Sequence, residues 1–248
     1  MESIRGWDFS RVRAVRDPVP WEYTEVDRRY LCPTDRVLDI ATGGGEVFLS
    51  LAPYFDSGLG TDSSPEMVAT AKENTPTELR GKVSFEVMAA QDLDLGGNTF
   101  DVVLNRHGPV FVPSIVKALK PGGYFICQQV GSLNTQNIVQ LFGWESGGAY
   151  WRRYWDDHGF EHQDVDTLIR LFSEAGCDVV ASGSYNVGYT FLDLESLLFH
   201  LKAVPLPEDF DIERHGERVL RFVEENRTDE GIRTNEHREL LIVRRGEP

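Results

Sequence analysis

A ten-residue segment limits the possible folds of this chain more than any other feature. Residues 37–46 are VLDIATGGGE, an apolar run followed by a glycine turn and then by helix-forming residues. The apolar run predicts a buried strand at Arg36–Ile40, and the apolar spacing after the turn predicts a helix over residues 45–54. Glycines at such a turn let the backbone approach a ligand closely at the carboxyl edge of a sheet. We therefore expect an α/β fold with a ligand site at this turn.

Short apolar runs continue to alternate with helical patterns as far as residue 130, which is typical of βαβ units in a mostly parallel sheet. Ser64, Pro65 and Glu66 predict the start of a second helix, with a hydroxyl cap and a proline at the first helical position. The further expected strands are residues 57–61, 83–87, 100–104 and 124–130. This order predicts a doubly wound, Rossmann-like sheet.

The pattern is weaker after residue 131. Residues 132–160 have no clear period and predict an insertion, whose aromatic side chains form either a wall for an apolar or planar substrate or a small separate core. These aromatic residues are Trp144, Trp151, Tyr154 and Trp155. Regular patterns return as helices over 162–175, 192–202 and 212–226, with strands over 178–189 and 238–244.

A length of 248 residues suits one domain with modest additions. We therefore expect a single domain over 1–248. It consists of an N-terminal arm or helix (1–34), a ligand-binding core (35–131), the insertion (132–160) and a C-terminal part of the sheet with its helices (161–248).

Acidic residues outnumber basic ones by 40 to 25, so the formal net charge is −15. A negative field of this size repels polyphosphates and anionic lipid head groups, which disfavours nucleic acid as a substrate and a membrane as a partner. Three widely spaced cysteines predict neither a disulfide framework nor a zinc site, and no apolar run has the ~18 residues of a membrane span. The N-terminal residues contain no apolar signal core, so we expect a cytoplasmic protein.

The residues around the glycine turn discriminate between classes of ligand. A dinucleotide-binding turn needs a small residue where this chain has Phe48, or Glu46 if the count starts at Ala41. Glu46 also puts a carboxylate at the start of the helix, where a pyrophosphate would otherwise bind. A cationic nucleoside without phosphates, such as S-adenosylmethionine (SAM), suits this acidic turn better.

Asp62 is the second acidic residue at a predicted strand end. It follows the glycines by about 20 residues, the separation expected for a carboxylate that binds both hydroxyls of an adenosine ribose. The alternative is a role in the first turn of the next helix, because Ser63 and Ser64 follow it. We favour the ribose role.

Five segments resemble the successive motifs of class I SAM-dependent methyltransferases. They are VLDIATGGGEV, GTDSSPEMVATAKE, AAQDLDL, FDVVLNRH and LKPGGYFICQQVG, which lie between residues 35 and 131. A weaker resemblance links TNEHRELLIVRR, near the end of the chain, to the closing strand of that fold. The resemblance implies a seven-stranded, mostly parallel sheet with an antiparallel last strand, and an enzyme that transfers a methyl group from SAM.

The resemblance also assigns cofactor contacts by position. It implies that Asp39 and the backbone of residues 42–45 hold the methionine part and that Asp62 holds the ribose. Ser63 and Met67 would border the adenine, and Asn105 would lie beside the methionine part and the transferred methyl. The full implied set is Asp39, Ala41, Thr42, Gly43, Gly45, Asp62, Ser63, Met67, Gln91, Asp92, Leu93 and Asn105.

Two positions depart from the family pattern. Ala41 stands where the family usually has the first glycine, a small change that the turn can tolerate. Ala89 stands where an acid often precedes the adenine contact, so Gln91 or Asp92 must do more of that work.

Methyl transfer is an in-line displacement at an activated carbon, so alignment and desolvation are the protein's main contributions. If the acceptor must lose a proton, His107 is the best candidate for its base or for an acceptor contact, although it could equally be a loop residue that only lines the site. His158 and His162 do not form a metalloprotease motif, and we expect no metal site.

The leading hypothesis is an enzyme that methylates a small-molecule acceptor, with the acceptor atom and the oligomeric state left open. One alternative is a non-catalytic SAM-binding or protein-interaction module on the same fold. A nicotinamide-dependent oxidoreductase and an RNA methyltransferase are further alternatives. The first is disfavoured by Glu46 and Phe48, and the second by the net charge.

Overall fold

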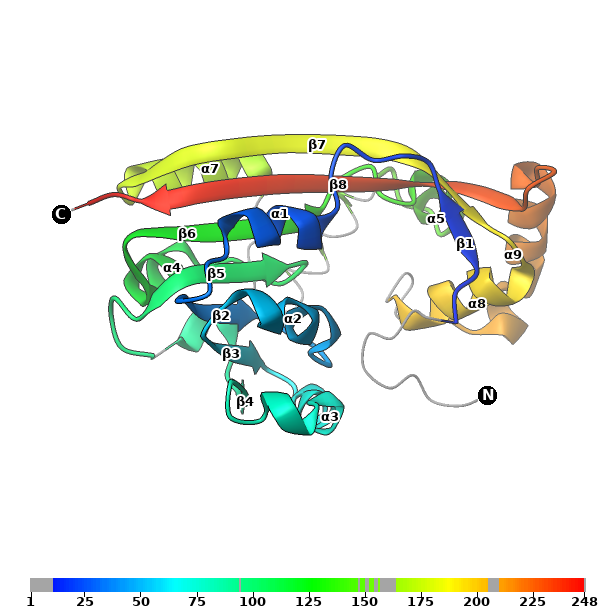
Figure 1. Cartoon of the computed structure of the whole chain (residues 1–248). Coiled ribbons are helices and arrows are strands. Elements are labelled where there is room, and N and C mark those ends of the chain that lie inside the picture. The colour runs from blue at the N-terminus through cyan, green and yellow to red at the C-terminus, as the bar shows by residue number, and fades with distance from the viewer. Residues whose placement is uncertain are drawn as a thin grey trace. The chain divides into compact units, whose positions relative to one another are not determined.

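The computed structural model describes residues 11–93, 95–146, 148–149, 152–153, 156, 164–204 and 210–247 (Figure 1). Backbone contacts divide the chain into two compact units. The core unit contains residues 21–129, 163–183 and 239–248, and the second unit contains residues 1–20, 130–162 and 184–238. The candidate site described below lies within the core unit.

The sheet has eight strands in the order β1-β7-β8-β6-β5-β2-β3-β4. Adjacent strands from β6 to β4 in this order pair in parallel. The strands of the core unit are β2 (Arg36–Ile40), β3 (Ser57–Asp62), β4 (Val83–Val87), β5 (Phe100–Arg106), most of β6 (Leu119–Val130), and parts of β7 (Cys177–Phe191) and β8 (Ile232–Arg245). Figure 1 shows β8 running opposite to β5 and β6, as expected for the last strand.

The strand order reverses at β2. From β2 the chain passes to β3 and β4 on one side and then returns to β5 on the other side. Ligands of open α/β sheets bind at the carboxyl ends of the strands where the order reverses in this way. The first predicted strand, β2, therefore stands at the topological switch point.

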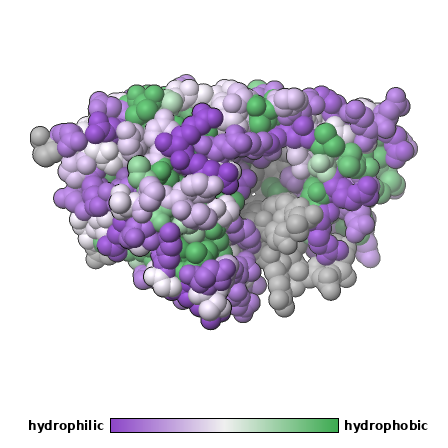
Figure 2. Space-filling model, viewed as in Figure 1, coloured by the Kyte–Doolittle hydropathy of each residue, from purple (hydrophilic) through white to green (hydrophobic). Residues whose placement is uncertain are grey.

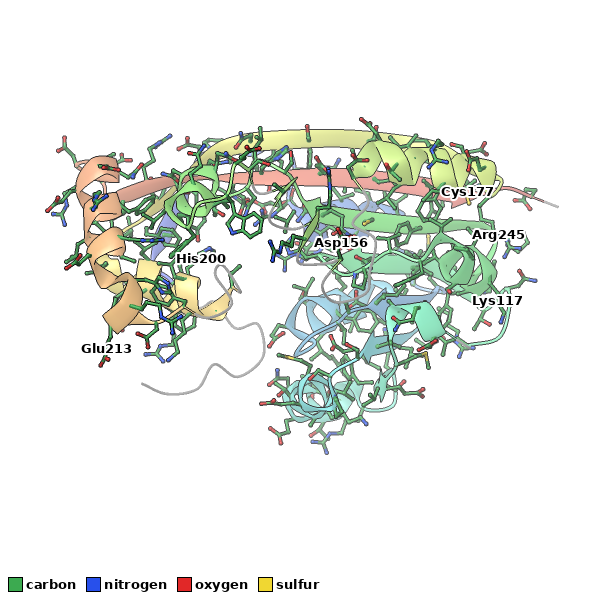
Figure 3. The ribbon with its side chains drawn as sticks, turned by 180° about the vertical axis from the view of Figure 1, so that it is seen from behind. Lys117, Asp156, Cys177, His200, Glu213 and Arg245 are labelled. Carbon is green, nitrogen blue, oxygen red and sulfur yellow. The ribbon has the colours of Figure 1, made fainter. Side chains whose placement is uncertain are left out.

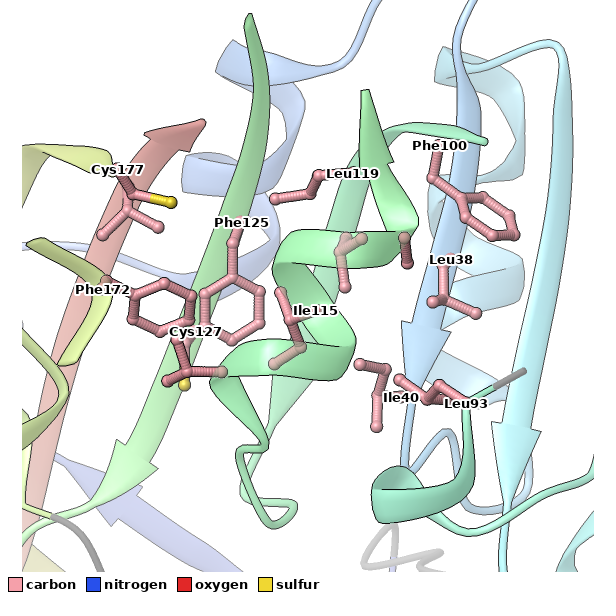
Figure 4. Packing of buried hydrophobic residues seen from close by; sticks show 14 of the residues in the cluster. Leu38, Ile40, Leu93, Phe100, Ile115, Leu119, Phe125, Cys127, Phe172 and Cys177 are labelled. Carbon is pink, nitrogen blue, oxygen red and sulfur yellow. The ribbon is translucent and has the colours of Figure 1, made fainter. Parts of the chain in front are cut away.

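Helices cover both faces of the core-unit sheet, because side chains alternate between the faces along each strand. Leu38 and Ile40 of β2 pack in one hydrophobic cluster with α4 (Val112–Ala118) and α7 (Val165–Glu174). Figure 4 shows this cluster, in which the rings of Phe125 and Phe172 lie 5.0 Å apart. The other face is covered by α1 (Tyr23–Tyr30), α2 (Glu46–Leu51) and α3 (Pro65–Asn74).

Short 3-10 helices complete the core unit. They lie at Ala52–Tyr54, Thr77–Leu79 and Ala90–Asp92. The predicted helix over residues 45–54 is therefore α2 followed by a 3-10 turn. The Ser64 hydroxyl caps α3 by accepting a hydrogen bond from the backbone N–H of Met67 (3.2 Å), as the sequence predicted.

Large side chains on α2 pack against glycines of β3. A Cβ on Gly58 would lie 2.6 Å from the Phe48 ring, so that strand position must be glycine for the ring to fit. Phe48 is 1% exposed and stacks on Phe55 with ring centroids 5.3 Å apart. A dinucleotide-binding turn places its small residue on the helix, whereas here the small residue is on the strand.

The second unit adds a strand that the sequence pattern does not reveal. β1 (Ala14–Arg16) pairs antiparallel with β7, with Ala14 opposite Phe191. The expected count of seven strands was therefore wrong, because a three-residue strand carries no periodic signal. The helices of this unit include α5 (Gln136–Leu141), α8 (Leu194–Ala203) and α9 (Ile212–Asn226).

Most predicted elements agree with the structure, and the differences lie at their ends. β6 begins at Leu119 rather than at the expected residue 124, and Gly122 within it has a φ of +75°. α5 lies within residues 132–160, where no regular element was expected. Trp151, Tyr154, Trp155, His158 and His162 are outside the described residues.

All three cysteines are free thiols, and Cys127 and Cys177 are buried. Hydrophilic residues predominate on the described face in Figure 2. Among the helices of the described residues, none combines the length and the apolar character that crossing a membrane requires. Figure 3 shows side chains of both units, with Lys117 and Cys177 in the core unit and His200 and Glu213 in the second unit.

Candidate functional site

The carboxyl ends of β2, β3 and β5 lie side by side in the sheet. Asp39 pairs in register with Gly60 on β3 and with Leu104 on β5. The next residue, Ile40, pairs with Thr61 and Asn105. The predicted site residues Asp39, Asp62 and Asn105 therefore come together at one edge of the sheet.

The glycine turn after β2 depends on left-handed backbone conformations. Ala41 has a φ of +57°, Gly43 of +57° and Gly45 of +78°. The N–H of Thr42 donates to the carbonyl of Thr61 (2.9 Å), which ties the turn to the end of β3. Residues 43–45 are buried, so their backbone forms a closed cradle at the start of α2.

Asp62 fastens this cradle to the next helix. One carboxylate oxygen accepts a hydrogen bond from the N–H of Gly43 (2.9 Å) and the other accepts one from the N–H of Ser64 (2.9 Å). Asp62 therefore does shape the first turn of α3, as the alternative interpretation proposed. Each oxygen retains capacity for another hydrogen bond, so this role does not preclude ribose binding.

Asp39 is a buried acid at the end of β2, only 8% exposed. Burial raises the pKa of Asp39 to about 7, and the negative charge of Asp62 acts in the same direction. The hydrogen bond from the Thr42 hydroxyl and the charge of Arg106 partly oppose this rise. A buried carboxyl in this state is readily ionised by a cation that binds beside it.

The residues expected around the adenine differ in exposure. Leu93 is buried and Met67 is half-buried, so they can supply apolar contacts. Ser63, Gln91 and Asp92 are exposed and can supply polar ones. These positions follow the ends of β3 and β4, next to Asp62 in the sheet.

Asn105 is fully buried and organises the loop after β5. Its side-chain amide donates to the carbonyl of Pro109 (3.1 Å), and its side-chain oxygen accepts from the N–H of Gly108 (3.1 Å) and from Nε2 of Gln129 (3.1 Å). His107, between them, has a φ of +66°. Asn105 thus holds the backbone that presents His107.

The segment before β2 brings further polar side chains to the sheet. Tyr23 on α1 donates its hydroxyl to the carbonyl of Ile126 (3.3 Å), and Trp21 donates its indole N–H to Oε1 of Gln128 (3.1 Å). On the same helix Asp27 is 0% exposed. Its place in the apolar stripe formed by Tyr23 and Val26 is the signal that could have identified it.

These groups fit SAM. The cradle has acids at two neighbouring strand ends, which suits a ligand with cationic groups and hydroxyls. Both carboxylate oxygens of Asp27 are buried polar atoms without a hydrogen-bond partner in the described part of the chain. Buried polar atoms are normally paired, so these are available for a ligand.

Residues 37–123 match the family model described as a methyltransferase domain. This match spans the glycine turn, Asp62 and the Asn105 loop. Residues 37–123 are therefore similar to a methyltransferase domain.

Curated proteins similar to this chain include a ubiquinone biosynthesis O-methyltransferase from Cereibacter sphaeroides. It is 29% identical over 157 residues, which cover 58% of this chain and 61% of the relative. The chain spans about half the length of the first curated relatives that it matches.

Solved structures share the fold of this chain. The YcgJ protein of Bacillus subtilis superposes with a TM-score of 0.61 at 16% identity, covering 91% of this chain and 99% of that protein. The Haemonchus contortus phosphoethanolamine N-methyltransferase 2, solved with phosphomonomethylethanolamine and S-adenosylhomocysteine, has a TM-score of 0.56 at 19% identity. That likeness covers 90% of this chain and 52% of the other.

Proposed function

We propose that this protein transfers a methyl group from SAM to a small-molecule acceptor. One observation carries the proposal: a closed glycine cradle lies between two acids, Asp39 and Asp62, at adjacent strand ends. The methyltransferase domain match over residues 37–123 supports the same activity. A cationic, phosphate-free nucleoside is the ligand class that this arrangement favours.

The cofactor contacts follow from the positions of the groups. Asp39 and the backbone of residues 41–45 bind the methionine part, and Asp62 accepts hydrogen bonds from the ribose hydroxyls. The adenine lies between Met67 and Leu93. Ser63, Gln91 and Asp92 provide the polar contacts at its rim.

Bound SAM would supply a methyl group that its sulfonium has already activated. The protein's task is to align the acceptor with this methyl and to exclude water. The Asn105 loop performs the alignment, because its buried side-chain hydrogen bonds fix the position of residues 105–109. His107 on this loop contacts the acceptor and removes its proton where the reaction requires one.

The acceptor class is a small molecule. The net charge of −15 opposes binding of nucleic acid. The Cereibacter relative acts in ubiquinone biosynthesis, and the Haemonchus structure holds a small phosphorylated amine. Both are consistent with a small acceptor, although their substrates differ.

Binding tests the cofactor assignment first. We expect SAM and S-adenosylhomocysteine each to raise the melting temperature of the protein, because both bind only the folded state, and NAD to leave it unchanged. The variant Asp62→Ala should lose most of this stabilisation. Stabilisation by NAD alone would assign the cradle to a dinucleotide.

Turnover then tests the activity itself. Purified protein is incubated with SAM and a panel of small metabolites, and release of S-adenosylhomocysteine is measured. Release that depends on one metabolite supports the enzyme. Tight SAM binding with no release across broad panels of metabolites, RNAs and proteins would favour the non-catalytic module.

A further inference from the structure

Asp27 is a fully buried acid whose presence the packing of α1 does not explain. It is 0% exposed, and neither of its carboxylate oxygens has a hydrogen-bond partner within the described residues. Burying an ionised carboxylate without a partner costs several kcal/mol, on the order of a large fraction of a domain's stability. A residue of this kind indicates that a ligand completes its surroundings.

The geometry puts Asp27 on the same face of the sheet as Asp39. Val37 belongs to the hydrophobic cluster that α1 and α2 cover, and Asp39 lies two residues further along β2, so its side chain points to the same face. On α1, Asp27 follows Tyr23 by four residues and therefore shares its helix face. Tyr23 in turn is hydrogen bonded to Ile126.

The pairing of the strands shows which residue of β2 is in register with the Tyr23–Ile126 hydrogen bond. Ile126 on β6 is paired with Leu104 on β5, and Leu104 is paired with Asp39 on β2. The Tyr23 hydroxyl thus reaches the sheet at the level of Asp39. α1 therefore carries Asp27 to the end of β2 that holds the glycine cradle.

The charges around Asp27 agree with this placement of the two acids. Burial raises the pKa of Asp27 well above its usual value, Asp39 raises it further, and Arg106 lowers it. The pKa of Tyr23 is raised by burial first and then by Asp27 and Asp39, with Cys127 adding to the rise and Arg106 opposing it. Two buried acids that repel each other form a strong site for a cation with hydrogen atoms to donate.

We propose that Asp27 and Asp39 together bind the ammonium group of the amino-acid part of the cofactor, an inference that rests on the proposed function. An ammonium group has three N–H donors and can serve both carboxylates, whereas a sulfonium has none. A metal ion is a poorer occupant, because the described residues contain no group of three or more possible metal ligands. Asp27 is thus a cofactor-binding residue contributed by the helix that precedes the methyltransferase domain match.

The test compares two ligands, one with the amino-acid part of the cofactor and one without it. S-adenosylhomocysteine carries the amino-acid part, and 5′-methylthioadenosine has the same adenosine and sulfur without it. Calorimetry with Asp27→Asn should show affinity for S-adenosylhomocysteine reduced by about tenfold or more, the size of one lost charge-assisted hydrogen bond. Affinity for 5′-methylthioadenosine should stay within about twofold of the wild type.

Glu25→Gln provides the matched control. It removes the same charge from the same helix at an exposed position, so both affinities should stay at their wild-type values. Unchanged S-adenosylhomocysteine affinity in Asp27→Asn would overturn this inference and leave the proposed function intact. A wild-type protein that binds neither ligand would instead overturn the proposed function and this inference with it.

A second measurement needs no variant and so does not depend on the folding of Asp27→Asn. The pKa of Asp39 in the empty protein is about 7, and burial and the charge of Asp39 also raise the pKa of Asp27. An ammonium group that binds between the two carboxyls favours their ionised forms, so calorimetry at pH 6 in buffers of different ionisation enthalpy should detect more proton release with S-adenosylhomocysteine than with 5′-methylthioadenosine. Equal proton release with the two ligands would contradict the shared site.

Discussion

The methyl group of Ala41 lies where a side chain on Gly108 would have to be placed. A Cβ built on Gly108 would lie 2.5 Å from the Ala41 Cβ, far inside van der Waals contact. The two residues belong to the loops that follow β2 and β5, and Gly108 also donates its N–H to Asn105. The alanine that replaces the family's first glycine is thus accommodated by a glycine on the neighbouring loop.

This contact predicts a coupled pair of substitutions. Gly108→Ala should lower the free energy of unfolding by about 1–3 kcal/mol, because the added methyl overlaps that of Ala41. Ala41→Gly should be nearly neutral, because two effects oppose each other. It relieves about 1 kcal/mol of strain from the left-handed conformation of Ala41, and it stabilises the unfolded state by a similar amount through the greater conformational freedom of glycine. The double variant should recover much of the loss. Chemical denaturation of all four proteins gives the coupling energy, and simple additivity would contradict the contact.

The raised pKa of Asp39 predicts a pH dependence of stability. Because the folded state binds the proton more tightly than the unfolded state, the stability that this group contributes is fully present below its usual pKa of 3.8 and is lost as the pH rises to about 7. Asp39→Asn removes the titration. The free energy of unfolding of the empty protein should therefore fall more steeply between pH 4 and about 7 in the wild type than in the variant. Parallel curves would show that Asp39 is not the cause.

Asp62→Ala should weaken binding of every ligand that contains the ribose, which distinguishes the role of Asp62 from that of Asp27. Asp62→Ala removes the acceptor for the Gly43 and Ser64 N–H groups as well as the proposed ribose contact. We expect affinity for S-adenosylhomocysteine and for 5′-methylthioadenosine to fall together, by about tenfold or more, because both ligands contain the ribose. Calorimetry that shows a loss for only one of them would argue against the ribose role.

The second unit contains a half-buried ion-pair network whose removal should be costly. Glu236 accepts from Arg16 (3.0 Å), Arg238 (3.2 Å) and the Tyr185 hydroxyl (2.9 Å), and its side chain is 13% exposed. Glu236→Gln should lower the free energy of unfolding by about 3 kcal/mol, because the partly buried guanidinium groups of Arg16 and Arg238 lose the negative charge that they pair with.

Glu174→Gln serves as the comparison for that network. Glu174 pairs with Arg170 one turn away on α7, and both side chains are about 60% exposed. Its loss should cost less than about 0.5 kcal/mol. Equal effects of the two substitutions in denaturant titrations would mean that burial does not set the strength of the Glu236 network.

Substitution of His107 tests the role given to the Asn105 loop. With a responsive acceptor, His107→Ala should lower kcat by about a hundredfold and flatten its pH profile if the imidazole accepts a proton. Full turnover with an unchanged profile would leave His107 as a lining residue. Asn105→Ala should affect both kcat and KM, because it releases the backbone of the whole loop.

The strands and helices of the core unit were predictable because their apolar periods are local. β4 matches its predicted bounds, β2 does so as well, and α9 in the second unit is equally accurate. β1 was not predictable, since its three residues are defined only by pairing with a strand about 175 positions later in the chain. Local patterns contain no information about such a partner.

The site was predictable where motif spacing fixes it and not where packing does. Asp39 lies near the end of one predicted strand and Asp62 follows the next, so their meeting at one edge follows from parallel pairing. Asp27 was missed because a charged residue within EYTEVDRRY suggests a solvated helix face. Its burial depends on how α1 is docked, which Tyr23 and Trp21 determine through contacts with β6.

The concentration of acids around the cradle has a consequence for the end of the proposed catalytic cycle. Methyl transfer converts the sulfonium into a neutral thioether, so the spent nucleoside is held by one positive charge fewer than the fresh one. Asp39 and Asp62 lie at adjacent strand ends, and both face the cationic ligand in the proposed site. The proposed contacts therefore predict weaker binding of S-adenosylhomocysteine than of SAM, which would favour exchange of the product for a new donor molecule.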